Sequence, residues 1–213
     1  MNKAIFGFLA AGAALAGVSP ALADAGHESV QQIYDAGRCI VSRDRGTAIS
    51  LLQRLPVDGD ATDLTNLPEN ARRCARGLSS ADTLHLRGAI AQALFFRDFG
   101  GFGIEPRRST PLVNLGLPTQ DTQGGTRLVL LYRWADCLVR NDAAHAERLL
   151  ASGVGSRNET SAIDQMRNFM AVCAPPGSQL AVQPAELRSL LAQSAYHSMY
   201  RYWTDQLAPV RDQ

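Results

Sequence analysis

The sequence predicts an all-α fold in which two similar helical units, about four helices each, pack as one disulfide-stapled domain. A stretch of eleven residues occurs twice, as YDAGRCIVSRD over Tyr34 to Asp44 and as YRWADCLVRND over Tyr132 to Asp142. Both copies place apolar residues at helical spacing. The chain also contains four cysteines, and an even number in a secreted chain favours two disulfides.

The two copies are related by an offset of 98 residues, which brings Cys39 onto Cys137. Further along, Cys74 falls near Cys173 at an offset of 99, and LRGAIAQALF resembles LRSLLAQSAY at an offset of 101. Small loop insertions account for the drift. Two units of this length favour duplication within one domain over a solenoid, which needs at least three shorter repeats.

The start of the chain has the features of a secretory signal peptide. Lys3 gives a positive first segment, an apolar run follows, and Ala21-Leu22-Ala23 is a small-residue cleavage site. The apolar run is short for a bilayer span of ~20 residues. We therefore expect the mature chain to begin at Asp24, to be secreted across the inner membrane into the periplasm, and to insert into no membrane.

Four segments follow from these features. Residues 1–23 form the signal peptide, 24–98 the first helical repeat, 99–126 a glycine- and proline-rich connector, and 127–213 the second repeat.

Lys3 is the only lysine, so the mature chain balances its arginines against 20 acidic residues. A net charge near zero gives no electrostatic footprint for nucleic acid or for an anionic membrane.

Cysteine spacing favours one disulfide inside each repeat. Cys39 and Cys74 are 35 residues apart, and Cys137 and Cys173 are 36 apart, as a duplication requires. The pairing of Cys39 with Cys137 and of Cys74 with Cys173 also respects the repeat and stays open. A zinc site with four cysteine ligands is disfavoured, because the chain has no C-x-x-C pair.

The repeated stretch is expected to be the first helix of each unit. In both copies the apolar stripe points nearly opposite the cysteine, so a disulfide requires a second segment across the far face. In the second copy the far face is apolar too, which predicts Arg127–Arg140 as the buried central helix. Asp44 and Asp142 are expected to cap the helices that follow. The fourth helices are expected over Ser80–Asp98 and Pro184–Trp203.

Two polar pairs match across the fourth helices, Arg87 with Arg188 and Gln92 with Gln193. They are either a paired polar feature of the core or duplicated surface positions, and the surface is the favoured interpretation.

The connector, 99–126, holds six glycines and three prolines without a helical period. Its apolar residues predict an ordered segment packed on the helices, and the alternative is a lid or partner-binding loop.

Histidines close to carboxylates give the strongest enzymatic signal. Asp82 with His85, and Asp142 with His145, each place a carboxylate and an imidazole on one helical face, as metal sites in bundles do. Helix capping is the stronger explanation for both aspartates, because both lie at helix starts. We therefore assign no catalytic residue, no metal ligand and no cofactor.

These motifs resemble those of a loose group of uncharacterised secreted proteins from alphaproteobacteria. The resemblance covers most of the mature chain and rests on Cys39, Cys74, Leu86-Arg87-Gly88, Cys137 and Cys173. It implies a repeated cysteine-bearing helix followed, after a second cysteine, by an alanine-rich helix. It implies no activity.

The leading hypothesis is a non-enzymatic extracytoplasmic binding or scaffold protein whose partner is a cell-envelope protein or ligand. The expected partner surface joins the connector to the aromatic end of the last helix and comprises Phe99, Phe102, Arg107, Arg108, Tyr196, His197, Tyr200 and Trp203. One alternative is a metal-dependent or hydrolytic periplasmic enzyme that uses His85, His145 or His197. A second alternative is a carrier of an apolar ligand held between helices.

Overall fold

The computed structural model is all-helical over the residues that it describes, which are 20–53, 67–79, 82–105, 110–112, 126–175 and 180–207. These residues form eight helices and no strand: α1 (Pro20–Arg43), α2 (Arg45–Leu52), α3 (Glu69–Cys74), α4 (Thr83–Phe99), α5 (Thr126–Asn141), α6 (Ala143–Ala151), α7 (Arg157–Cys173) and α8 (Pro184–Leu207). The predicted signal peptide lies outside the described residues, apart from residues 20–23 at the start of α1.

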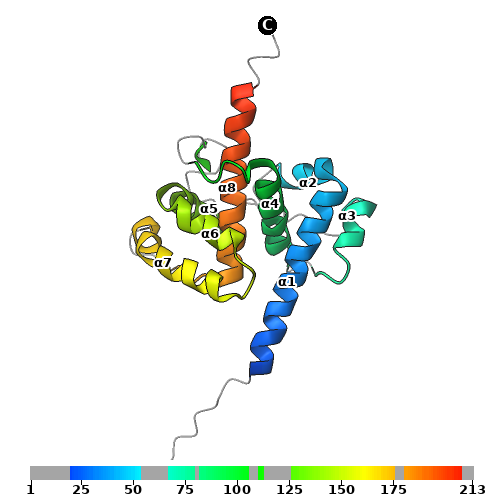
Figure 1. Cartoon of the computed structure of the whole chain (residues 1–213), viewed down its shortest axis with the longest axis horizontal. Coiled ribbons are helices and arrows are strands. Elements are labelled where there is room, and N and C mark those ends of the chain that lie inside the picture. The colour runs from blue at the N-terminus through cyan, green and yellow to red at the C-terminus, as the bar shows by residue number, and fades with distance from the viewer. Residues whose placement is uncertain are drawn as a thin grey trace, which may run out of the picture.

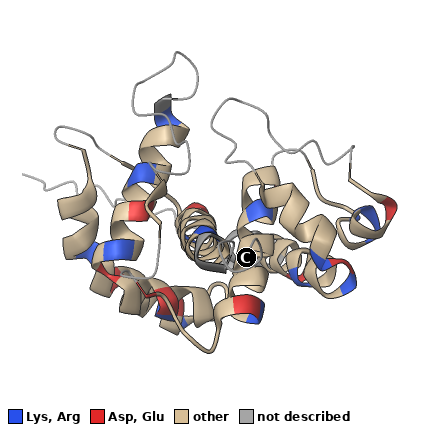
Figure 2. Ribbon diagram, turned by 90° about the horizontal axis from the view of Figure 1, so that it is seen from above, with Lys and Arg blue, Asp and Glu red and all other residues tan. Residues whose placement is uncertain are grey.

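Helix α8 runs through the middle of the molecule, with α4 beside it (Figure 1). Helices α1, α2 and α3 lie on one side of this pair, and α5, α6 and α7 lie on the other. The view along α8 in Figure 2 shows the same two groups, with basic and acidic residues interspersed in both. Helix α4 packs against α1, α2 and α8, whereas α8 also packs against α5 and α6. The two groups therefore meet along α4 and α8.

The buried centre is α8, so the prediction that Arg127–Arg140 is the central helix was wrong. Every residue from 187 to 196 is buried. Helix α5 covers the predicted range, but it begins at the surface, where Arg127 is exposed. The prediction assumed that the central helix is apolar on all sides. The centre of α8 instead buries Arg188 and several other polar residues.

A glycine allows α4 and α8 to approach closely. A Cβ atom at Gly88 would lie 2.4 Å from both Cα and Cβ of Ser189. Gly37 has the same function where α1 crosses α4, since a Cβ there would lie 2.6 Å from the carbonyl carbon of Ala89. Neither crossing leaves room for a side chain, so the spacing of three helices depends on these two positions.

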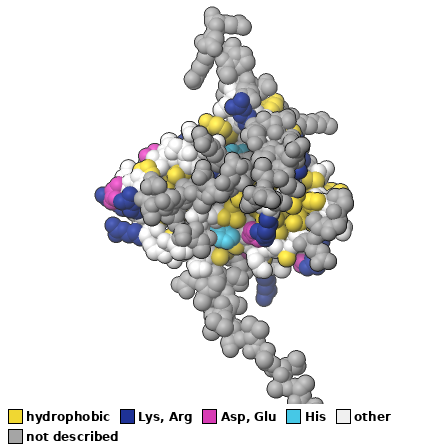
Figure 3. Space-filling view, turned by 180° about the vertical axis from the view of Figure 1, so that it is seen from behind, with side chains coloured by type: hydrophobic (Ala, Val, Ile, Leu, Met, Phe, Trp, Pro, Cys, Tyr) yellow, Lys and Arg dark blue, Asp and Glu magenta, His cyan; other side chains and the backbone are white. Residues whose placement is uncertain are grey.

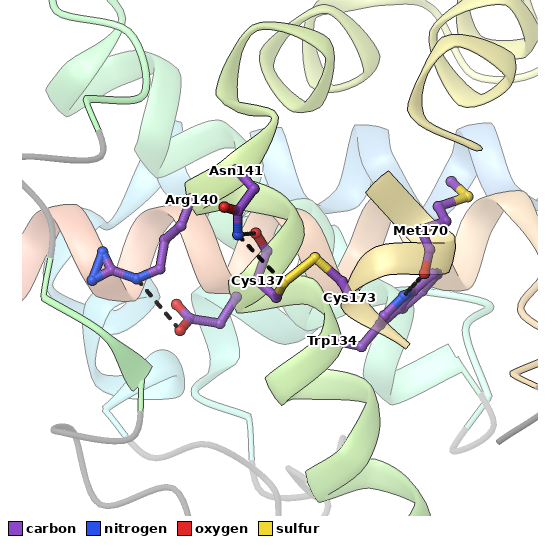
Figure 4. The surroundings of a disulfide bond; sticks show 7 residues. Trp134, Cys137, Arg140, Asn141, Met170 and Cys173 are labelled. Atoms are coloured by element: carbon purple, nitrogen blue, oxygen red, sulfur yellow. Dashed lines mark hydrogen bonds and ion pairs between the residues drawn. A yellow bond between two sulfur atoms is a disulfide. The ribbon is translucent and has the colours of Figure 1, made fainter. Parts of the chain in front are cut away.

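Both disulfides that the cysteine spacing favoured are present. Cys39 is bonded to Cys74, which joins α1 to α3, and Cys137 is bonded to Cys173, which joins α5 to α7. Figure 4 shows the second bond, beside which the indole of Trp134 donates a hydrogen bond of 3.0 Å to the carbonyl oxygen of Met170. Each disulfide therefore fixes an outer helix against the face of α1 or α5 that carries the cysteine. Such pairing indicates an oxidising, extracytoplasmic compartment.

One of the two expected aspartate caps forms. The carboxylate of Asp44 accepts hydrogen bonds from the backbone N–H and the hydroxyl of Thr47, at 3.0 and 2.7 Å, at the start of α2. Asp142 precedes α6 but its side chain caps no backbone N–H. Its Oδ1 instead lies 2.6 Å from Nδ1 of His145. The prediction for Asp142 was therefore wrong, because Oδ1 faces the imidazole and the buried Oδ2 accepts no hydrogen bond.

The described parts of the connector pack onto the helices. Ile104 and Leu112 are buried, and the backbone N–H of Ile104 donates a 3.2 Å hydrogen bond to Glu147 on α6. The backbone N–H of Thr110 donates to the carbonyl oxygen of Ser198 on α8, at 3.0 Å. Within the described residues, no helix is long and apolar enough to cross a bilayer.

Replacement of Gly88 by alanine is expected to destabilise the fold by about 3 kcal/mol, because the new methyl group meets the backbone of α8. Urea unfolding followed by circular dichroism measures the effect. Gly101→Ala is the matched control, since a Cβ there would meet no atom within 4 Å. Equal stability of the two variants would contradict the close crossing.

Candidate functional site

Two arginines are buried where α4 and α8 meet, so the prediction that they lie at the surface was wrong. Arg87 is 5% exposed and Arg188 is 0% exposed. Gln193 is also fully buried, and Gln92 is partly buried. A buried guanidinium is tolerated only when hydrogen bonds replace the water that it loses. The partners of these two side chains therefore decide how the centre of the molecule is organised.

Arg188 has a full set of partners around its guanidinium. Its Nε donates a 2.9 Å bond to Glu159, which is itself 5% exposed, and its Nη2 donates a 2.8 Å bond to the hydroxyl of Ser152. Its Nη1 lies 3.1 Å from the carbonyl oxygen of Ser152 and 3.4 Å from Oε1 of Gln92. The guanidinium also lies over the ring of Tyr34, 5.6 Å from the centroid.

Arg87 makes the corresponding contacts toward α8 and α2. Its Nε donates to Oε1 of Gln193 at 3.4 Å, and its Nη1 donates to the carbonyl oxygen of Leu51. Burial lowers the pKa of Arg87, and Tyr132 opposes this effect. The hydroxyl of Tyr132 donates a 2.7 Å bond to the same Gln193 oxygen. Each arginine thus contacts the glutamine that belongs to the other helix.

The side chains of Arg87, Arg188, Gln92 and Gln193 form a buried polar centre between α4 and α8. The hydroxyl groups of Ser189 and Tyr34 complete it. The hydroxyl of Ser189 donates a 2.8 Å bond to the carbonyl oxygen of Ala185 within α8. Its oxygen therefore accepts from Tyr34, whose hydroxyl lies 3.2 Å away, and lies 3.2 Å from Nδ1 of His85. Burial raises the pKa of the hydroxyl groups of Tyr34 and Tyr132 far above their usual value. Both tyrosines are therefore neutral donors.

An open cleft borders the polar centre and lies between α1, α4 and the turn that joins α6 to α7. Its volume is ≈ 760 Å³. Buried Tyr34 and Arg188 form part of its lining, and Gln92 links its α4 wall to its α6 wall through a 2.8 Å bond to the carbonyl oxygen of Leu150. Ligand sites in proteins commonly have volumes of about 300–1,000 Å³. The cleft is therefore large enough for a small molecule.

The three candidate histidines are not gathered into one site. His85 contacts Ser189, His145 contacts Asp142, and Nε2 of His197 is buried without a hydrogen-bond partner. Among the described residues, no group of three or more His, Cys, Asp or Glu side chains is placed to hold a metal ion. Ser189 is fully buried and donates its proton within α8, so it is not poised as a nucleophile beside His85.

The expected partner surface is only partly a surface. Phe99 and Tyr196 are buried, whereas Phe102 is 61% exposed. The ring of Phe102 packs on that of Trp203, with 5.3 Å between the ring centroids. Tyr200 stacks on Tyr196 at 5.5 Å. The other members are His197, which is partly buried, and Arg107 and Arg108, which lie outside the described residues.

Another hollow lies on the α5–α7 side of the molecule, where Figure 3 shows hydrophobic side chains gathered. Its volume is ≈ 370 Å³, and Trp134, Met170 and Leu187 are among its lining residues. Its arginine, Arg167, already pairs with Asp164 at 2.7 Å. The hollow is therefore mainly apolar and offers little to orient a ligand.

No protein-family model, curated protein or solved structure matches the chain. The resemblance to secreted alphaproteobacterial proteins stays a prediction, and function is inferred from the geometry of the chain's own residues. Sequence reasoning missed the cleft. One signal for it was present, because Gln31, Tyr34, Arg38 and Ser42 repeat at helical spacing and mix polar with aromatic residues along one side of α1.

Replacement of Arg188 by methionine is expected to destabilise the protein by about 3–5 kcal/mol, because Glu159 is left buried and unpaired. The double variant Arg188→Met/Glu159→Gln should lose less, and urea unfolding of the three proteins measures the difference. Arg167→Met is the control, since its pair with Asp164 is exposed and such pairs contribute about 0–1 kcal/mol. Equal effects of Arg188→Met and Arg167→Met would contradict a buried ion pair.

His197 predicts a specific dependence of stability on pH. Burial, with a smaller contribution from Arg87, lowers its pKa to about 3, whereas an unfolded histidine has a pKa of about 6.5. Between these values the unfolded chain binds a proton that the folded chain does not. Stability should therefore fall as the pH drops below 6.5, by up to about 1.4 kcal/mol per pH unit from this group.

Replacement of His197 by phenylalanine should remove this component of the acid sensitivity. Urea unfolding at pH 7.0 and at pH 4.5 measures it, and the wild-type protein should lose roughly 2–3 kcal/mol more than the variant over this interval. The carboxylates are common to both proteins, so their contribution cancels in the comparison. Parallel losses in the two proteins would show that His197 remains accessible to protons.

Proposed function

We propose that this protein is a non-enzymatic, periplasmic binding module whose ligand site is the cleft between α1, α4 and the α6–α7 turn. The observation that carries the proposal is the combination of that cleft with a fully bonded polar centre beneath it. The arginines, glutamines and tyrosines of the centre are all occupied by partners within the protein. They hold the cleft walls in place and leave no group there poised for chemistry.

We further propose that the protein consists of two pseudo-equivalent helical units. Three observations support this. Each disulfide joins the cysteine-bearing helix of one proposed unit to the helix that carries that unit's second cysteine. Arg87 contacts Gln193, and Arg188 contacts Gln92, so the contacts are reciprocal. The tight crossing of α4 and α8 lies between Gly88 and Ser189, which occupy matched positions.

A cleft that the two units line unequally is what a duplication followed by divergence would produce. The cleft is walled by two helices of the first proposed unit and by a turn of the second. Its floor therefore depends on both units, and neither unit alone would form it. Binding is thus proposed as a property of the whole domain.

Secretion is proposed from the predicted signal peptide together with the two disulfides. Expression of the full chain in a bacterial host should yield a periplasmic protein whose N-terminal residue is Asp24, as N-terminal sequencing measures. Non-reducing peptide mapping of the same sample should recover both disulfides. A protein that keeps residues 1–23 and remains in the cytoplasm would contradict the proposed localisation.

Binding at the cleft is tested by blocking it. Ala93 is a small, partly exposed residue of the α4 wall, and Ala93→Trp should fill the space without reaching the polar centre. A fragment library with neutral, anionic and cationic members is screened by ligand-observed NMR against both proteins. We expect a set of fragments to bind the wild-type protein and to lose binding to the variant.

The matched control is Ala151→Trp, since Ala151 is an exposed residue of α6 that lines the same cleft. Its indole has open solvent available and should reduce binding less than that of Ala93→Trp. A library in which no fragment distinguishes the wild-type protein from Ala93→Trp would exclude the cleft as a ligand site.

A further inference from the structure

The walls of the cleft are mainly apolar. The apolar contributions come from three separate segments: Tyr34 and Val41 on α1, Ala93 and Phe96 on α4, and Leu150 and Val154 around α6. A ligand that fills this space must therefore present a substantial apolar body, because burial of apolar surface is the main favourable term available there.

All charged side chains among the described lining residues are arginines. They are Arg38, Arg97 and Arg188, and no aspartate or glutamate joins them in that lining. Glu159 pairs with Arg188 and Asp35 pairs with Arg38, which leaves Arg97. The charge that faces the cleft is therefore positive.

Arg97 is the cation that remains without a counter-ion. Its Nη1 donates a 2.8 Å hydrogen bond to the carbonyl oxygen of Val41, which fixes the side chain across the gap between α4 and α1. No carboxylate pairs with it among the described residues; the neighbouring Asp98 is taken by Arg45, at 2.8 Å. A guanidinium has five N–H donors, so most of those of Arg97 stay available.

A held guanidinium beside an apolar wall matches one kind of ligand. The planar fork of arginine pairs with a carboxylate through two parallel hydrogen bonds, which are about twice as strong as neutral ones. A cationic ligand would be repelled by the same group, and a neutral one would leave the charge unpaired. The positive charge of Arg97 and its free N–H donors therefore favour a ligand that carries an anionic group on an apolar body.

We propose that the cleft binds a small amphipathic carboxylate, such as a medium-chain fatty acid, with its carboxylate at Arg97 and its chain against the apolar walls. This assignment rests on the proposed binding function. The polar head lies at the rim, where Arg97 is exposed, and the chain lies along the apolar walls of α4 and α6.

The test uses isothermal titration of the mature protein with three ten-carbon probes at low salt: decanoate, decanol and decyltrimethylammonium. Decanoate should bind roughly tenfold more tightly than either of the others, because a hydrogen bond to a charged group contributes on the order of tenfold. Arg97→Gln should weaken decanoate binding by roughly tenfold and leave decanol binding unchanged.

Arg43→Gln is the matched control, since Arg43 is an exposed arginine near the end of α1 and does not line the cleft. It should leave decanoate binding unchanged. Ala93→Trp should abolish binding of decanoate, which places the probe in the cleft rather than on another surface.

The outcomes separate this assignment from the function on which it rests. Equal affinity for decanoate and decanol, both lost in Ala93→Trp, would overturn the carboxylate assignment and keep the cleft as a binding site. Equal loss of decanoate binding in Arg97→Gln and Arg43→Gln would also overturn it, because long-range charge would then explain the preference. Absence of decanoate binding, when neutral fragments do bind, would overturn it as well. Failure of every probe and every fragment would overturn both proposals.

Discussion

The close crossing of α4 and α8 at Gly88 and Ser189 is the constraint on which the rest of the structure depends. The two backbones approach so closely there that a Cβ atom at Gly88 would lie 2.4 Å from Ser189, and the arginines next to both residues lie inside the contact between the helices. Arg87 and Arg188 are therefore buried, and each needs acceptors from other helices. Those acceptors come from α2, from the α6–α7 region and from the partner helix. The hydrogen bonds of two arginines thus fix the positions of the surrounding segments around one crossing.

The same arrangement shapes the cleft. Arg188 and Gln92 bind backbone carbonyl groups at the end of α6, which brings this part of the chain over the groove between α1 and α4. The floor of the cleft is consequently polar but fully bonded, and its walls are apolar. Such a surface is suited to holding a molecule in a defined orientation. Ser189, which lies beside His85, donates its proton to the carbonyl oxygen of Ala185 within α8 and is therefore not free to act as a nucleophile.

Much of the fold follows from local patterns in the sequence. Apolar spacing located α4, α5 and α8 to within a few residues, and the equal cysteine separations identified the disulfides, because both depend on short stretches of chain. The burial of Arg87 and Arg188 did not follow. Whether an arginine is buried depends on acceptors supplied by tertiary packing, such as the carbonyl oxygen of Leu51 and the carboxylate of Glu159. The cleft was missed for the same reason, since three distant segments build it. A sequence clue existed in the shared offset of the two arginines, which a surface position would not need to keep.

The central claim is that the α4–α8 crossing is the most stable part of the molecule. Hydrogen exchange of backbone amides tests this claim most directly. If the buried arginines and the close contact organise the fold, amides over residues 187–196 of α8 and around Gly88 should exchange only through global unfolding. Amides of α3 and of the outer part of α7 should exchange earlier, through local opening. Exchange of the α8 centre as fast as that of α3 would contradict the account, because the crossing would then be a contact between independently opening units.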